Sequence, residues 1–146
     1  MPETNDVAGL IDRLTAIHGE EGVCPTAGDW RAIFAVGGSG PVHILNLLKF
    51  RASLDTPDGP ISGAAAYAKY ASGVGKAFAR AGGERVFFGR VGHMFAFGSA
   101  NDWDAAIVTL YPSAHALAAM WLDPEFIDAH RNRQDGVERS QVLVFG

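Results

Sequence analysis

The segment Pro41–Phe50, PVHILNLLKF, decides the fold of this chain, because it predicts a β-strand over Val42–Phe50 with two apolar faces. Side chains along a strand point alternately to opposite faces of the sheet. Apolar residues occupy both sets of positions, with Val42, Ile44 and Leu48 on one face and Leu45 and Leu47 on the other. A strand with one face in water would alternate apolar and polar residues. We therefore expect both faces of the sheet that holds this strand to be covered.

Residues 63–81 predict a helix that packs against this sheet. Ser62 can cap its first turn, and Gly82 with Gly83 can end it. One face carries apolar residues at helical spacing, namely Tyr67, Tyr70, Ala71, Val74, Phe78 and Ala81. The opposite face carries Lys69, Lys76 and Arg80.

The rest of the chain predicts further strands and helices that complete a sheet. They are, in order, an extended stretch over 84–98, a strand over 104–112, a helix capped by Ser113, a helix from Asp123 and Pro124 to Gly136, and a strand over 139–145. The resulting order is strand, helix, strand, strand, helix, strand. This is the ferredoxin-like βαββαβ order of an α+β fold, a four-stranded antiparallel sheet with helices on one face.

Residues 1–40 predict an N-terminal helical extension that leads into the main domain, residues 41–146. The first helix of the extension is amphipathic, and Asn5 or Asp6 can cap it. Its apolar positions are Val7, Leu10, Ile11, Leu14 and Ile17. A second, short helix is expected around Asp29 to Ala35, before a run of glycines.

The helices of the main domain can cover only one of the two apolar faces of the sheet. Either a second copy of the sheet or the N-terminal helices must cover the other face. We favour the second copy, which gives a homodimer whose sheets pack face to face.

Composition limits the classes of function. A chain of 146 residues with 48% hydrophobic residues is the size of one globular domain, and it has no apolar run long enough to cross a membrane. A net charge of −4 argues against nucleic acid as a partner. A single cysteine, Cys24, and a start without the pattern of a secretion signal favour a cytoplasmic location.

The last predicted helix carries a candidate catalytic residue. Phe126, Ile127 and His130 share one face of it. His130 is therefore either a residue at the edge of the core, bonded to a backbone carbonyl, or a site residue that moves a proton. Arg131 and Arg133 are expected to be solvated or to interact with the C-terminal end of the helix dipole.

Five other residues are candidate ligand-binding groups. Asn46 interrupts an apolar strand, so its amide is either structural, bonded to a neighbouring loop, or orients a substrate. Tyr67 and Tyr70 either pack in the core or help form a pocket for an aromatic or enolic ligand. Trp121 is either a core residue or an aromatic wall, and Arg90 is a candidate rim cation for an anion.

Known catalytic and cofactor motifs are absent from the sequence. The five histidines have no partner at metal-ligand spacing, so no metal site is expected. There is no phosphate-binding loop and no nucleophile elbow, and no cofactor is expected. Spacing does not exclude a single histidine that ligates haem, so a haem protein stays an alternative.

The segments VHILNLLKFR, the helix with Tyr67 and Tyr70, WDAAIVTLYPS and DPEFIDAHRNRQDGVERSQVLV resemble the family known as domain of unknown function 1330. The resemblance extends from Pro41 to Phe145. It implies membership of the dimeric α/β-barrel superfamily and subunits that pair through their sheets, and it implies no particular reaction. Superfamily relatives include cofactor-free monooxygenases, lactone isomerases, haem enzymes and ligand sensors, whose ligands commonly lie between sheet and helices.

These observations favour a protein that binds a small organic ligand. If it is an enzyme, we expect cofactor-independent oxygenation or isomerisation, with His130 as general acid or base. Asn46 and Tyr67 would then orient the ligand, and Arg90 would neutralise developing negative charge. The alternatives are a non-catalytic ligand sensor or structural dimer, and a haem-binding protein.

Overall fold

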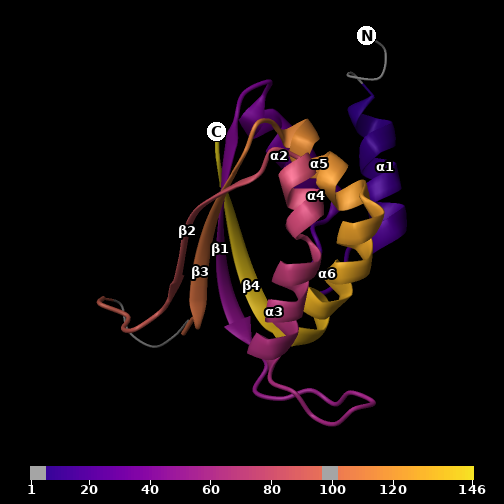
Figure 1. The fold of residues 1–146 in the computed structure, drawn as a ribbon. Coiled ribbons are helices and arrows are strands. Elements are labelled where there is room, and N and C mark those ends of the chain that lie inside the picture. The colour runs from indigo at the N-terminus through magenta and orange to yellow at the C-terminus, as the bar shows by residue number, and fades with distance from the viewer. Residues whose placement is uncertain (1–5, 97–101) are drawn as a thin grey trace.

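Four strands form one antiparallel sheet with the strand order β2-β3-β1-β4 (Figure 1). The computed structural model describes residues 6–96 and 102–146. The strands are β1 (Val42–Phe50), β2 (Glu84–Arg90), β3 (Ala105–Tyr111) and β4 (Val137–Phe145). The central strand β1 pairs with β3 on one side and with β4 on the other. The predicted ferredoxin-like sheet is therefore confirmed.

The described residues form six helices beside the sheet, and most begin where the sequence predicts. They are α1 (Val7–His18), α2 (Ala27–Gly37), α3 (Gly63–Gly73), α4 (Gly75–Arg80), α5 (Ala114–Leu122) and α6 (Pro124–Gly136). The side chains of Asp6, Ser62, Ser113 and Asp123 accept hydrogen bonds from the first turns that they cap. Asn5, the other candidate cap of α1, lies outside the described residues.

Two predicted elements differ from the structure. The helix expected over residues 63–81 divides into α3 and α4 at Val74, because glycines flank this residue on both sides and favour a break. The extended stretch expected over 84–98 forms a strand only as far as Arg90, and residues 91–96 have no regular structure. Residues 97–98 lie outside the described part of the chain.

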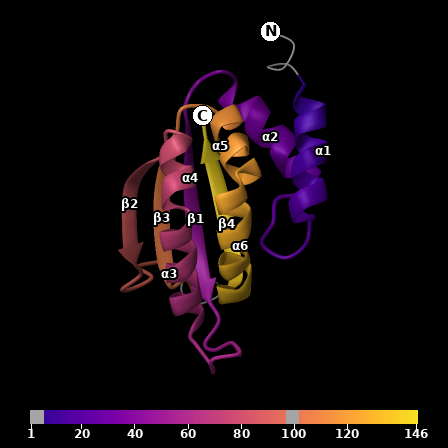
Figure 2. The same ribbon diagram turned by 45° about the vertical axis from the view of Figure 1, so that its right-hand side comes forward.

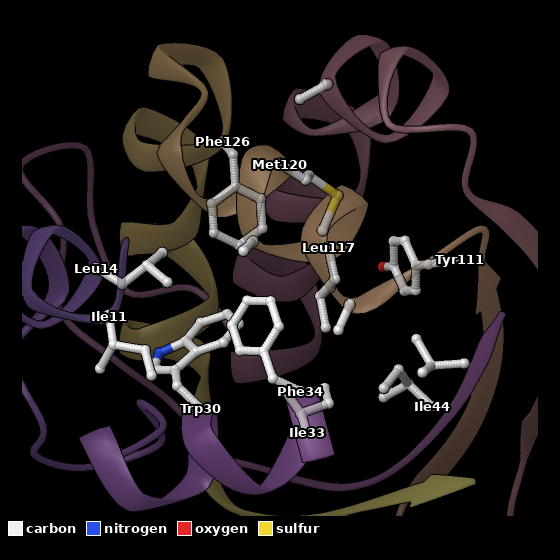
Figure 3. Close-up of a cluster of buried hydrophobic side chains, with 14 of the residues drawn as sticks. Ile11, Leu14, Trp30, Ile33, Phe34, Ile44, Tyr111, Leu117, Met120 and Phe126 are labelled. Atoms are coloured by element: carbon white, nitrogen blue, oxygen red, sulfur yellow. The ribbon is translucent and has the colours of Figure 1, made fainter. Parts of the chain in front are cut away.

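All six helices lie on the same side of the sheet, as Figure 1 shows. The helices α1 and α2 lie beside α5 and α6 (Figure 2). One hydrophobic cluster joins these elements, and it includes Ile11, Leu14, Trp30, Ile33, Phe34, Leu117, Met120 and Phe126 (Figure 3). The N-terminal helices therefore share the core of the main domain.

The other side of the sheet, the helix-free face, carries a band of apolar side chains. These residues alternate with those that face the helices, and strand pairing aligns them across the sheet: Leu45, Leu47, Phe87, Val108, Leu110, Leu143 and Phe145. Phe87 is 55% exposed and Phe145 is 50% exposed. The described N-terminal helices do not cover this face, because they pack on the opposite side.

The start of α3 crosses the end of α6 at close range, beside the end of β1. Arg51 donates its backbone N–H to the carbonyl of Gly136 (2.9 Å), and Gly63 donates to the carbonyl of Arg51 (2.9 Å). A Cβ atom on Gly136 would lie 2.5 Å from the carbonyl oxygen of Gly63, so only glycine allows this approach. Tyr67 and Arg133 lie about one helical turn from the crossing, which brings them to the same side of the sheet.

Candidate functional site

A cavity of about 510 Å³ lies between the sheet and the helices. The sheet contributes Ile44, Asn46, Thr109, Tyr111, Ser140, Val142 and Val144 to its wall. The helices contribute an aromatic and apolar wall that includes Trp30, Ile33, Tyr67, Tyr70, Val74, Phe78, Leu117, Met120 and Trp121. Ligand sites typically enclose roughly 300–1,000 Å³ and combine such walls with a few polar groups. The cavity is therefore the candidate functional site.

Four of the five predicted ligand-binding residues line this cavity. They are Asn46, Tyr67, Tyr70 and Trp121. The fifth, Arg90, does not line it. Arg90 lies in a second depression between α3 and β2, where Lys49, Arg51, Arg85 and Phe88 also lie. Tyr67 contributes to the walls of both.

The position of Arg133 differs from the prediction. It was expected to be solvated or paired with the helix end, but its side chain lines the cavity and is only 6% exposed. Its Nη2 donates to Asn46 Oδ1 (3.3 Å) and to Ser140 Oγ (3.5 Å), which are both long hydrogen bonds. Its Nη1 is buried and has no hydrogen-bond partner among the described residues. Arg131, two residues earlier, is exposed as predicted.

Asn46 therefore takes a role that the sequence did not indicate. The predicted alternatives are a bond to a neighbouring loop and a role in orienting a substrate; in the structure its oxygen accepts a hydrogen bond from Arg133 on α6 rather than from a loop, and the role toward a substrate stays a prediction. An amide whose oxygen is used in this way still has two N–H donors in its side chain. Those donors are available to other groups at the cavity wall.

The tyrosines of the cavity keep their hydroxyl protons at neutral pH. Removal from water raises the pKa of Tyr67 and Tyr70, and the positive charge of Arg133 offsets this only in part. Removal from water also raises the pKa of Tyr111 to about 12. The two aromatic rings of Tyr67 and Tyr70 contact each other, with centroids 5.3 Å apart. Their hydroxyl groups can therefore act as hydrogen-bond donors at the cavity.

His130 lies within an aromatic cluster and does not line the cavity. Its ring stacks on Phe126 with centroids 5.1 Å apart and contacts Trp121 at 4.6 Å. Its Nε2 is buried and has no hydrogen-bond partner among the described residues. Burial, together with the positive charge of Arg133 and the neighbouring His18, lowers the pKa of His130 to about 3. His130 is therefore uncharged at neutral pH.

A histidine of the N-terminal extension lies beside this cluster. His18 Nε2 is 2.7 Å from the carbonyl oxygen of Trp121, and the rings of His18 and His130 lie 5.4 Å apart. Within the described part of the chain, no group of three or more histidine, cysteine, aspartate or glutamate side chains is arranged to hold a metal ion. No helix among the described residues is both long and apolar enough to cross a membrane.

The N-terminal extension supplies one wall of the cavity, which the sequence analysis did not foresee. Trp30, Ile33 and Val36 of α2 line it, as do residues 22–25 of the preceding loop. Ala32 of α2 and Val142 of β4 line the cavity and are also exposed, so its mouth lies between these two elements. The apolar face of α2 could be read from the sequence, but no local pattern indicates which part of the sheet it meets.

Comparison with known proteins places the chain among relatives of unknown function. The family model described as "Domain of unknown function (DUF1330)" matches residues 60–146. The crystal structure of a protein of unknown function from Rhodopseudomonas palustris is 33% identical, and the match covers 85% of this chain and 95% of that chain with a TM-score of 0.77. A methylated form of the same protein gives 33% identity, 84% and 92% coverage, and a TM-score of 0.76.

A more distant structure is a dimeric protein of unknown function and ferredoxin-like fold from Bacteroides fragilis. It is 12% identical, with a TM-score of 0.48 over 73% of this chain and 95% of that chain. No curated protein matches the chain. Because the family model matches more than half of its residues, and a relative is 33% identical over most of both chains, this chain belongs to the family of the domain of unknown function 1330.

Proposed function

We propose that the protein binds a small organic molecule in the cavity between its sheet and its helices. The observation that carries this proposal is the joint presence of Asn46, Tyr67, Tyr70 and Trp121 in one cavity of about 510 Å³. The cavity is concave, opens between α2 and β4, and has a volume within the range of roughly 300–1,000 Å³ that is typical of ligand sites. Apolar walls with a few polar groups are typical of ligand sites, because the walls desolvate the ligand while the polar groups orient it.

We also propose that the functional unit is a homodimer that pairs through the helix-free face. An antiparallel sheet with apolar residues on both sides needs a cover on each side. The N-terminal helices pack on the cavity side, which leaves Leu143 and Phe145 of the helix-free face exposed and Leu45 only partly buried. A second sheet packed on this face would bury them at the usual spacing of about 10 Å.

The catalytic form of the hypothesis stays a prediction. It assigns oxygenation or isomerisation without a cofactor to the protein, with His130 as acid or base and Arg90 as the counter-ion. The described residues that line the cavity include no histidine, so binding is the function that the geometry supports best. The haem alternative stays a prediction too, and a Soret band in the purified protein would support it. The cytoplasmic location also stays a prediction.

A titration with an uncharged fluorescent dye tests the binding proposal. N-phenyl-1-naphthylamine brightens in apolar surroundings, so we expect a saturable increase in fluorescence with one site per chain. Ala32 lines the mouth of the cavity, and Ala35 is exposed on the same helix without lining it. We expect Ala32→Trp to weaken dye binding about tenfold or more, a loss of about 1.4 kcal/mol, and Ala35→Trp to leave it unchanged.

Two outcomes of this titration would contradict the proposal. One is the absence of saturable binding by the wild-type protein. The other is equal binding by the Ala32→Trp and Ala35→Trp variants, because the dye would then occupy another surface. Circular dichroism of each variant provides the control for folding.

A further inference from the structure

Arg133 is a buried cation for which the described part of the protein provides no counter-ion. The ion pairs among the described residues involve Lys49, Arg80 and Arg139, and none involves Arg133. A guanidinium group keeps its charge under all ordinary conditions and presents five N–H donors. Among the described residues, the terminal nitrogens Nη1 and Nη2 make only two hydrogen bonds, both long and both donated by Nη2. Such a group is costly to bury unless a negative charge accompanies it.

The groups around Arg133 also favour an anion. Its two partners, Asn46 and Ser140, are uncharged, and each retains hydrogen-bonding capacity of its own. Tyr67 and Tyr70 line the same cavity, and each carries a hydroxyl group that can donate a hydrogen bond. A ligand that brings only acceptor oxygens to this end can satisfy all of them.

One carboxylate contributes to the cavity wall, and it is already engaged elsewhere. Asp29 is exposed, and its Oδ2 accepts the backbone N–H of Thr26 (2.9 Å) in the capping box of α2. Apart from Asp29 and Arg133, the described residues that line the cavity carry no aspartate, glutamate, lysine or arginine. Arg133 therefore determines the sign of the charge that the cavity prefers.

The other residues of the cavity wall indicate the chemical nature of the uncharged part of the ligand, its body. Among the described residues, the aromatic side chains that line the cavity are Trp30, Tyr67, Tyr70, Phe78, Tyr111 and Trp121. Aromatic walls favour a flat or aliphatic apolar body, because they bury its surface without needing polar partners. The cavity thus combines one cationic position with an apolar enclosure.

We propose that Arg133 binds the anionic group of the ligand, and that the ligand is a small organic carboxylate with an apolar, preferably aromatic, body. A carboxylate matches the planar fork of the guanidinium group and can accept two parallel hydrogen bonds from it. This inference rests on the proposed function, because it names the chemical class of the ligand of that same cavity. It assigns the role of counter-ion to Arg133 in place of Arg90.

Matched pairs of charged and uncharged probes test the inference. The probes are 2-naphthoate with 2-naphthamide and octanoate with octanamide, each measured by calorimetry and by displacement of the fluorescent dye. We expect the wild-type protein to bind at least one carboxylate about 10- to 100-fold more tightly than its amide, the range expected for charge-assisted hydrogen bonds. In Arg133→Met we expect the carboxylate and the amide to bind equally.

Three further variants separate Arg133 from the other cations. Arg131→Met removes the same charge from the exposed side of α6, and Arg90→Met removes it from the second depression. Both variants are expected to keep the wild-type preference for the carboxylate. Arg133→Lys retains the charge without the planar fork and is expected to keep a smaller preference. If Arg133→Met does not fold, the ratio of carboxylate to amide affinity, measured for the wild-type protein and for Arg133→Lys, still tests the inference.

The outcomes distinguish this inference from the proposed function. Equal binding of carboxylates and amides by the wild-type protein, or a preference that disappears in Arg90→Met but persists in Arg133→Met, overturns the inference while the cavity remains a binding site. The inference also falls if the dye binds and neither carboxylate displaces it. Failure of the dye itself to bind instead contradicts the proposed function.

Discussion

His130 and Arg133 lie about one turn apart on α6 and are both buried, yet the two side chains differ in charge. His130 adapts to burial by staying uncharged, whereas a guanidinium group carries a permanent charge. The spacing of Phe126, Ile127 and His130 predicts an inward-facing histidine, and His130 is 1% exposed. The same spacing extends to Arg133, seven residues after Phe126. Residue type alone predicts a solvated arginine, because charged side chains are rarely buried, whereas helical periodicity places Arg133 on the buried face.

The lowered pKa of His130 predicts a dependence of stability on pH. In the unfolded chain its pKa is about 6.5, so the unfolded state binds a proton below that pH while the folded state does not until about pH 3. Stability is therefore lost as the pH falls from about 6.5 towards 3. Between about pH 7 and pH 5 we expect the wild-type protein to lose about 2 kcal/mol more unfolding free energy than His130→Phe does.

Urea unfolding at the two pH values measures this difference. Phenylalanine fits the stack on Phe126, and the other ionisable groups are common to both proteins, so the comparison isolates His130. Replacement of the exposed His93 by Gln provides the matched loss of a histidine. An identical loss of stability in wild type and His130→Phe would show that His130 is not kept neutral by the fold.

At the scale of the elements, the sequence predicts the features of helices and strands that depend on residues close together in the chain. Caps, apolar stripes and terminating glycines act within a few positions, so β1 and the starts of α3, α5 and α6 lie where they were expected. The position of α2 against the sheet depends on tertiary contacts, and no local pattern predicted that Trp30 would help form the cavity. The position of Arg90 also depends on tertiary contacts. It lies on the side of β2 that faces the helices, but it lines the second depression and not the cavity. Four of the ligand-binding candidates line the cavity, because polar and aromatic residues within apolar segments can be recognised locally.

At the scale of the whole molecule, the sheet has two apolar faces with different partners. The cavity and the described helices lie on one face, and the other is the face on which we propose that a second copy of the chain packs. Exposed apolar side chains in a contiguous patch are uncommon on monomers and are typical of interaction surfaces. The two faces belong to alternate residues of the same strands, so pairing of the subunits and binding of the ligand can be tested separately.

A mass measurement tests the dimer. Light scattering after size-exclusion chromatography is expected to give twice the chain mass of 15.5 kDa. Leu143→Glu places a charge in the paired faces and is expected to give a monomer, because an unpaired buried carboxylate costs several kcal/mol. Ala79→Glu adds the same charge on the exposed side of α4 and is expected to stay dimeric. A wild-type mass of one chain at micromolar concentration would contradict the proposed pairing.

The central claim, that a small organic molecule occupies the cavity, is tested most directly by a crystal structure of the protein with 2-naphthoate. We expect density for the ring between Trp30, Tyr70 and Trp121, with the carboxylate about 2.7–2.9 Å from the guanidinium nitrogens of Arg133. Density for the probe in the depression beside Arg90, with the cavity closed by its own side chains, would contradict the claim.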